Sequence, residues 1–226
     1  MEESATLSRR EDPALPAEMT LLAALRAGDE DAFMALVDTY HASLLRFARM
    51  YVSDPAVAEE VVQETWLAVL RGLDRFEGRS SLKTWIFRIL MNIARTRGAR
   101  EGRSIPFSAL EDPASEFEPS VPADRFLPPD HPRWPGHWAS APGDWELGPE
   151  ARLLSGETRD VIEAAISTLR PGQREVITLR DIEGLEAPEV CSLLSISDGN
   201  QRVLLHRARS NVRMALERYF GREGHR

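Results

Sequence analysis

The sequence contains a single cysteine, Cys191, in 226 residues. One thiol cannot build an internal disulfide framework, which excludes the small secreted domains that depend on one and fits a reducing compartment. Apolar runs of about 18 residues are also missing, so no membrane insertion is expected. Residues 1–16 are charged and lack the apolar segment of a secretory signal peptide. These absences together predict a cytoplasmic protein.

Enzyme signatures are missing as well. The chain has no HExxH motif, no cysteine pair and no glycine-rich phosphate-binding loop. Asp130, His131 and His137 are the candidates for a metal site, but isolated histidines in a proline-rich segment are ordinary. The neighbouring carboxylates of Glu59 and Glu60 lack a basic or nucleophilic companion. We therefore expect no enzymatic activity, no metal and no cofactor.

The net charge of −8 is distributed unevenly along the chain. Residues 71–103 carry a net charge of +6 and residues 197–226 carry +4. By contrast, residues 1–70 carry −8 and residues 104–160 carry −7. Two basic islands in an acidic chain favour a protein that binds phosphate backbones at two places. The alternative is that both islands are solvated charged faces.

Apolar residues recur at three- and four-residue steps through most of the chain, which predicts helices. The clearest run extends from Phe33 to Tyr51, and Asp54-Pro55 begins a second helix that reaches about Gly72. A loop over residues 74–81 leads into a third helix. No segment of useful length alternates with the two-residue period of a strand. The expected fold class is all-α.

Residues 104–150 differ from the rest of the chain in composition. Most of the 15 prolines lie there, together with three of the five tryptophans. Such a segment cannot continue a helix and is long for a loop within one domain, so it predicts a linker. It would join a small helical domain over residues 19–103 to a second one over residues 151–220. The tryptophans are too many for a solvated tether, so we expect some of them to pack on a domain or a partner.

The second domain contains the pattern of a helix-turn-helix. Expected helices over residues 188–194 and 198–220 are joined by Ser195-Ile196-Ser197, and the second helix of such a motif enters the major groove of duplex DNA. One stripe of this last helix is apolar, and another side is rich in arginine. The side predicted to contact DNA carries Ser197, Asn200, Gln201, Arg202, His206, Arg209 and Arg213. The alternative is an amphipathic surface helix with solvated arginines.

A second basic face is expected on the helix after Ser81. Cations beside aromatic rings suit unpaired DNA, because bases stack on the rings while arginines hold the phosphates. The alternative is that the nearby Trp85 and Phe87 are core residues and that the cations only keep the surface solvated. The predicted outer side of the helix carries Thr84, Arg88, Met91 and Arg95.

Two sets of motifs resemble a known family. Asp54-Pro55, residues 58–66 (AEEVVQETW) and residues 76–86 (FEGRSSLKTWI) are similar to the second conserved region of extracytoplasmic-function (ECF) sigma factors, which belong to the sigma-70 family. Residues 168–176 (TLRPGQREV), with DIEG at residues 181–184 and LLHRAR at residues 204–209, resemble the fourth region of the same family. Both sets occur in the family's order, one on each side of the predicted linker.

The resemblance implies an alternative sigma factor with a helical-bundle region 2 and a helix-turn-helix region 4. Such a protein binds bacterial core RNA polymerase and promoter DNA, and directs promoter recognition, strand opening and transcription initiation. An anti-sigma factor is implied as a further partner. The residues implied to bind core polymerase are Glu60, Val61, Gln63, Glu64 and Trp66. Those implied to capture the −10 element are Phe76, Arg79, Ser80, Ser81, Lys83, Thr84, Arg88, Asn92 and Arg95. The DNA-contacting side of the last helix would read the −35 element.

The recognition helix departs from the family pattern. Residues 199–204 are GNQRVL, where many relatives have GTVKSR, so the promoter sequence cannot be inherited from better-known members. A stand-alone helix-turn-helix repressor or activator is the alternative function, and it would bind an operator tightly without polymerase. A protein that only sequesters a partner would leave both basic faces without a role. Cys191 is expected to pack within the helix-turn-helix and not to act as a redox sensor.

Overall fold

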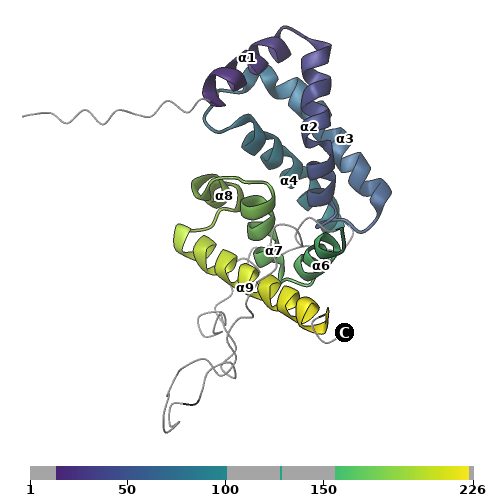
Figure 1. Ribbon diagram of the computed structural model, residues 1–226. Helices are drawn as coiled ribbons and strands as arrows, with labels where there is room; N and C mark the ends of the chain where they lie inside the picture. The colour runs from purple at the N-terminus through teal and green to yellow at the C-terminus, as the bar shows by residue number, and fades with distance from the viewer. Residues whose placement is uncertain (1–13, 101–127, 129–155, 224–226) are drawn as a thin grey trace, which may run out of the picture. The chain divides into compact units, whose positions relative to one another are not determined.

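The structure is a computed structural model that describes residues 14–100, residue 128 and residues 156–223 (Figure 1). The predicted linker, with Asp130, His131, His137 and its tryptophans, lies almost wholly outside these described residues. The chain divides into two compact units, residues 1–104 and residues 105–226. Helices and turns make up the described parts, which contain no strand, and the all-α prediction is confirmed.

The first unit is a helical bundle (Figure 1). Its core is formed by α2, α3 and α4, which pack pairwise on one another, while α1 contacts α2 and the short 3₁₀ turn η1. The elements in chain order are α1 (Ala14–Arg26), α2 (Glu30–Ala48), α3 (Pro55–Gly72), η1 (Leu73–Arg75) and α4 (Leu82–Arg100).

Short polar residues fix where α2 and α3 begin. The Asp29 carboxylate accepts a hydrogen bond from the Ala32 N–H at 3.1 Å, and the Asp54 carboxylate accepts one from the Ala56 N–H at 2.8 Å. Each bond satisfies a backbone donor that has no partner within its own helix. Pro55 occupies the first turn of α3, where its missing N–H costs nothing. The helix start predicted at Asp54-Pro55 is confirmed.

The core of the first unit is built around aromatic side chains. Phe47 and Phe87 are each 1% exposed and meet edge to face, with ring centroids 5.5 Å apart. Phe33 and Trp66 make a second such contact at 5.9 Å. Pairs of this geometry contribute about 0.5–1.5 kcal/mol beyond the burial of their area. The contact with Phe47 makes Phe87 a core residue that joins α2 to α4.

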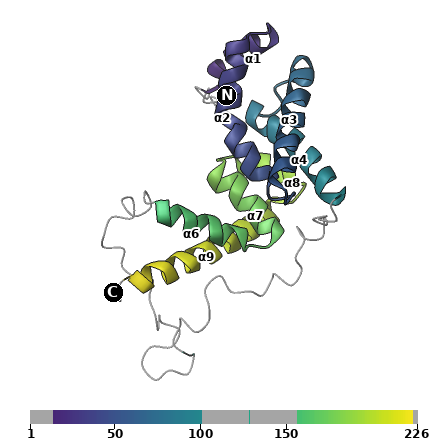
Figure 2. The same cartoon turned by 90° about the vertical axis from the view of Figure 1, so that its right-hand side faces the viewer.

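The second unit is organised by its last helix, which packs on the three other α-helices that the structure describes within residues 156–223 (Figure 2). Pro171 and Gly184 bracket a segment whose pattern predicts a single helix over residues 172–182, but the structure shows α7 followed by a π-helical turn. The wide turn is closed by the Glu183 N–H, which donates to the Thr178 carbonyl at 2.8 Å, and Gly184 (φ 69°) ends it. The elements are α6 (Gly156–Ser167), α7 (Pro171–Ile177), η5 (Thr178–Ile182), α8 (Ala187–Leu194) and α9 (Asp198–Glu223).

None of the helices in the described ranges combines the length and apolar character that a membrane crossing requires.

Candidate functional site

α8 and α9 form a helix-turn-helix. Ser195 adopts the left-handed conformation (φ 56°, ψ 42°) at the end of α8, and the Ile196 N–H donates to the Cys191 carbonyl at 3.1 Å. Ser197 then caps α9, because its hydroxyl accepts a hydrogen bond from the Asn200 N–H at 3.2 Å. The reversal between the helices is therefore specified by three consecutive residues, which set the start of α9.

One side of α9 is exposed and basic. Arg202, His206, Arg209 and Arg213 are all solvent-exposed, and their spacing of four, three and four residues places them on the same side of the helix. The other side is buried by contacts with α6, α7 and α8. α9 thus presents a cationic surface from a rigid support.

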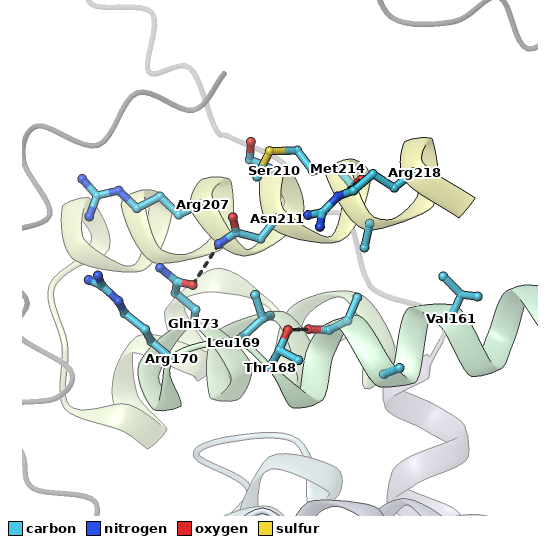
Figure 3. A pocket seen from close by; sticks show the side chains of 13 residues that line it. Val161, Thr168, Leu169, Arg170, Gln173, Arg207, Ser210, Asn211, Met214 and Arg218 are labelled. Atoms are coloured by element: carbon cyan, nitrogen blue, oxygen red, sulfur yellow. Dashed lines mark hydrogen bonds between the residues drawn. The ribbon is translucent and has the colours of Figure 1, made fainter. Parts of the chain in front are cut away.

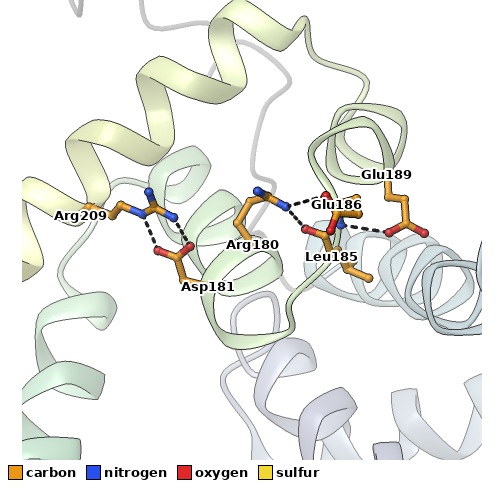
Figure 4. A network of polar contacts seen from close by, with 6 residues as sticks. All are labelled: Arg180, Asp181, Leu185, Glu186, Glu189 and Arg209. Atoms are coloured by element: carbon orange, nitrogen blue, oxygen red, sulfur yellow. Dashed lines mark hydrogen bonds and ion pairs between the residues drawn. The ribbon is translucent and has the colours of Figure 1, made fainter. Parts of the chain in front are cut away.

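Two of these cations are held by carboxylates, and Figure 4 shows one of the pairs, Arg209 with Asp181. Arg209 forms a two-pronged contact with Asp181, with Nε to Oδ2 at 2.8 Å and Nη2 to Oδ1 at 2.6 Å, and this hydrogen bonding raises the pKa of Arg209. Arg202 pairs with Asp198 at 2.7 Å, one turn earlier on the same helix. The paired geometry fixes the direction of a long flexible side chain before any ligand arrives.

Gln201 does not belong to this surface. The sequence placed it on the DNA-contacting side, but the structure buries it to 2% exposure. The last helix packs against three others, so its buried sector is wider than the apolar stripe predicts. Ser197 is exposed and Asn200 is half-buried at the start of the same helix.

The sequence analysis missed Val203. This side chain is 42% exposed and lies three residues before His206, next to Arg202. An apolar side chain among exposed cations has the chemistry to contact the C5 methyl group of thymine, which only the major groove displays. The three-residue spacing between Val203 and His206 places both on the same side of the helix and could have identified Val203. The sequence interpretation instead assigned the apolar residues of this helix to the buried stripe.

The loop between η1 and α4 forms a second polar surface. Phe76, 6% exposed, packs against Trp85 with ring centroids 5.0 Å apart. Gly78 takes a positive φ of 68°, a conformation that glycine adopts without strain, and Arg79 is exposed beside it. Ser80 and Ser81 are partly exposed. Phe76 therefore anchors the loop, while the residues after it face solvent.

The predicted outer face of α4 is only partly correct. Thr84 and Met91 are 1% and 2% exposed, because α4 packs on both α2 and α3 and so buries a broad sector. Arg88 and Asn92 are exposed as expected. Phe87 is a core residue, so it is not a platform for bases.

Two partly exposed cations of α4 lie over aromatic rings. The Lys83 ammonium is 5.8 Å from the centroids of both Tyr40 and Phe87, and the Arg95 guanidinium is 6.0 Å from that of Tyr51. Their stems cover apolar surface while the charged ends stay near solvent. The aromatic rings thus orient the cations, and core burial limits the access of bases to Phe87 and Tyr51.

A third surface runs along α3. Val61 is fully buried and Trp66 is 8% exposed, so the structure removes both from the predicted polymerase-binding set and assigns them to packing. Glu60 and Gln63 are exposed, and Leu67 and Leu70, at 51% and 48% exposure, continue their side of the helix. The sequence analysis missed both leucines because helical periodicity does not tell an exposed apolar stripe from a buried one.

Glu64 joins α3 to α4 through an ion pair. It is half-buried and pairs with Arg97 of α4, which also lies 3.5 Å from Glu60. This contact links α3 to α4 and leaves the Gln63, Leu67 and Leu70 side chains available for a partner.

A groove of about 740 Å³ lies between α6, α7 and α9 (Figure 3). Its lining mixes apolar and polar side chains, and the polar ones include Arg170, Arg207 and Arg218, with no acidic residue among the described lining residues. Arg207 is only 9% exposed, and its Nη1 atom has no hydrogen-bond partner among the described residues. Figure 3 shows Arg207 and Arg170 at the same end of the groove.

Comparison with protein families identifies both units. Residues 36–104 match the model of sigma-70 region 2, and residues 159–212 match that of sigma-70 region 4. The two matches occur in the family's order and together span more than half of the chain. The chain belongs to the sigma-70 family.

Curated relatives of this sigma factor include ECF RNA polymerase sigma-E factors. Those of Escherichia coli K12 and Salmonella typhimurium LT2 are each 29% identical over 196 residues, covering 86% of this chain and 92% of theirs. The RNA polymerase sigma-H factor of Pseudomonas aeruginosa is 28% identical over 200 residues, covering 88% and 94%. The predicted resemblance to ECF sigma factors is confirmed.

Two solved structures share the fold. CnrH, in complex with the cytosolic domain of CnrY, has a TM-score of 0.53 and 24% identity, covering 88% of this chain and 97% of that one. The sigma factor RpoE of Bartonella quintana, in complex with the anti-sigma factor NepR, has a TM-score of 0.50 and 23% identity, covering 81% and 96%.

This sigma factor is an alternative sigma factor that directs transcription initiation, as predicted. Sigma factors are initiation factors and not enzymes, so the phosphodiester chemistry belongs to the polymerase.

Proposed function

We propose that the two units divide promoter recognition between them. The second unit reads the −35 element as duplex DNA, and the first holds the unpaired strand of the −10 element. The observation that carries this proposal is that each unit matches one sigma region and exposes its own basic surface, while the chain as a whole has a net charge of −8. An acidic remainder suppresses indiscriminate DNA binding and leaves attraction at two places.

In the second unit, α9 enters the major groove. Arg202, Arg209 and Arg213 supply donors for phosphates and guanine edges, and His206 supplies a further polar contact. Ser197 and Asn200 lie at the N-terminal end of α9, where contacts with bases concentrate in helix-turn-helix proteins. Gln201, being buried, supports the helix from behind.

In the first unit, the exposed loop and the solvent side of α4 capture the melted strand. Arg79, Ser80 and Ser81 are placed to contact a displaced base, and Lys83, Arg88, Asn92 and Arg95 contact its backbone. Such a surface stabilises the open strand by binding energy, because the unpaired form is the only one that it fits. Phe76 and Thr84 act by holding the loop and the start of α4 in place.

α3 contacts core RNA polymerase through Glu60, Gln63, Leu67 and Leu70. Exposed leucines flanked by polar side chains form the kind of patch that protein partners cover. Replacing both leucines by serine is expected to weaken core binding by about tenfold or more, since buried apolar anchors dominate interfaces. The control is Met34→Ser on α2, another exposed apolar residue (55% exposure). Equal core binding by the double variant and the control would contradict this assignment.

An anti-sigma factor occupies the groove between α6 and α9. The apolar part of the lining, which includes Val161, Leu169 and Met214, suits the apolar side of a helix, and the three arginines suit carboxylates along the edge of that helix. The neighbours CnrH and RpoE were both solved with a bound partner protein, and for RpoE that partner is named an anti-sigma factor. We also place this sigma factor in the cytoplasm, where polymerase and promoter DNA meet.

The groove is tested with a partner captured from the native host and then purified. The purified partner should inhibit transcription in proportion to its concentration, and Arg207→Gln should weaken its binding by about tenfold while core binding is retained. Arg159→Gln on α6 is the matched control, because Arg159 is exposed and does not line the groove. Equal affinity of the partner for both variants would remove the groove from the interface.

Run-off transcription is the central experiment. Core polymerase with this sigma factor should initiate at defined promoters on host genomic DNA, and core polymerase alone should not. The isolated sigma factor should bind the same promoters weakly. Tight binding to promoter duplex without polymerase, together with no binding to core, would favour a stand-alone repressor or activator.

A further inference from the structure

We infer that α1 is a clamp that sets the shape of the loop proposed to capture the −10 base. The family match begins at residue 36, so α1 (Ala14–Arg26) lies outside it. Two charged side chains of α1 nevertheless bond to the backbone at the two ends of the loop over residues 76–82. The inference rests on the proposed role of that loop.

The first contact holds the start of the loop. Arg26 donates from Nε to the Leu73 carbonyl at 3.2 Å and from Nη2 to the Phe76 carbonyl at 2.5 Å. Leu73 begins η1 and its carbonyl also accepts the Phe76 N–H at 3.2 Å, while Phe76 directly follows η1, so Arg26 bonds to the backbone on both sides of this turn. A planar guanidinium is able to bond to two acceptors at once, so a single side chain fixes the path of the chain as it enters the loop.

The second contact holds the end of the loop. The Leu82 N–H, at the first residue of α4, donates to the carboxylate of Glu18. A negative charge at this position also interacts favourably with the positive end of the α4 dipole. The Ser81 hydroxyl accepts from the Thr84 N–H at 3.3 Å and completes the capping of α4.

Between the two contacts lies the exposed part of the loop. Glu77, Gly78 and Arg79 are exposed, and Gly78 has the flexible positive-φ conformation. Within residues 77–80 an exposed ion pair joins Arg79 to Glu77 at 2.7 Å, and the contacts at the two ends attach the segment to the rest of the unit. Because Glu18 and Arg26 lie on one helix, about two turns apart, they fix the separation of the ends. A loop of fixed width discriminates between bases better than one that adapts to each of them.

The test uses the holoenzyme on a promoter that it transcribes in the run-off assay. The probe is single-stranded DNA carrying the non-template −10 sequence, and a second probe has one −10 base replaced. We expect Arg26→Ala and Glu18→Gln each to reduce the affinity ratio of the two probes by roughly tenfold, because each removes hydrogen bonding by a charged group. Arg26→Lys should retain part of the wild-type difference in affinity between the two probes, since a lysine bonds well to only one of the two carbonyls.

Matched control variants distinguish a loss of loop positioning from a general loss of stability of the first unit. Arg49→Ala and Glu30→Gln change the same residue types at exposed sites on or beside α2 and should leave the ratio unchanged. Core binding and −35 duplex binding should stay within about twofold in the α1 variants, as expected for surface changes away from those contacts. An unaltered probe ratio in Arg26→Ala and Glu18→Gln would overturn the clamp, and so would a parallel loss of core binding and of affinity for both probes.

A loop variant distinguishes failure of the clamp from failure of the proposed function. Arg79→Ala combined with Ser80→Ala should lower the probe ratio if the loop contacts the −10 base. If this variant lowers the ratio and the α1 variants do not, the clamp alone is wrong. If the loop variant leaves the ratio unchanged, the proposed role of the loop is wrong, and the clamp fails with it.

Discussion

The two units solve the problem of orienting cations in different ways. In the first unit, Lys83 and Arg95 lie over aromatic rings. In the second, Arg202 and Arg209 are held by carboxylates at 2.7 and 2.6 Å. A ring contact places a cation over an aromatic face, whereas a two-pronged carboxylate contact also fixes the plane of a guanidinium. The first arrangement suits a flexible strand with exposed phosphates, and the second suits a duplex whose donors and acceptors have fixed positions.

The largest expected effect comes from the aromatic core of the first unit. Phe87→Ala should lower the free energy of unfolding of that unit by about 3–5 kcal/mol, because it empties a fully packed site beside Phe47. Urea denaturation followed by tryptophan fluorescence measures the change. Arg88→Ala, at the exposed neighbour, should alter stability by less than about 0.5 kcal/mol and weaken −10 binding. If Phe87→Ala remains stable and specifically loses −10 binding, Phe87 belongs to the DNA-binding surface and not to the core.

The next effect concerns the carboxylate-held arginine of the second unit. Arg209→Ala should weaken −35 duplex binding by about 1–3 kcal/mol, since it removes a direct donor. Asp181→Ala should have a smaller effect, and the double variant should match Arg209→Ala alone, because Asp181 acts through Arg209. Fluorescence anisotropy with a −35 duplex measures all three. Additive losses would show that Asp181 and Arg209 act independently.

A smaller effect is expected at Val203. Replacing thymine by deoxyuridine at each −35 position removes one methyl group, and the holoenzyme should lose affinity by about 0.5–1 kcal/mol at one position. Val203→Ala should abolish the sensitivity at that position and leave others unchanged. The control is Val212→Ala, further along α9 and half-buried. Equal sensitivity to deoxyuridine in the wild type and Val203→Ala would show that Val203 contacts no methyl group.

The smallest effect concerns Cys191 in α8, which supports the recognition helix. Burial raises the pKa of its thiol, and the nearby negative charge of Asp198 adds to the shift. A raised pKa lowers the thiolate fraction at neutral pH, so iodoacetamide should alkylate Cys191 more slowly than it alkylates a free thiol. The alkylation rate should increase only when the pH rises above the ordinary pKa range of a thiol. Cys191→Ser should retain transcription under oxidising conditions. Rapid alkylation at pH 7 would indicate a reactive thiol.

Much of the fold could be predicted from the helical periodicity of apolar residues and from the residues that cap helices. Asp29 and Asp54-Pro55 determine where α2 and α3 begin, because capping depends on residues within a few positions of one another. The helix-turn-helix was predicted for the same reason, since Ser195 to Ser197 act locally. The π-helical turn η5 (residues 178–182) was not predicted. It directly follows α7, and no capping residue or periodic pattern in the sequence marks where α7 ends and the wider turn begins.

The candidate surfaces were predicted less completely than the fold. Arg88, Arg202 and Arg213 are exposed as expected, since charged side chains are seldom buried. Thr84 and Gln201 were placed on the wrong side, because the width of a buried face depends on how many neighbours a helix has. The contacts of Arg26 and Glu18 join residues about 50 or more positions apart, and no pattern along the chain indicates them.

The sequence by itself determined the helical class, the two basic islands and the family motifs, because composition, periodicity and capping act over short distances. Only the tertiary structure decided which side chains of each helix face solvent, which carboxylates hold which arginines, and that α1 bonds to both ends of a distant loop. These features depend on how the helices of each unit pack, and packing brings together residues whose separation in sequence carries no signal.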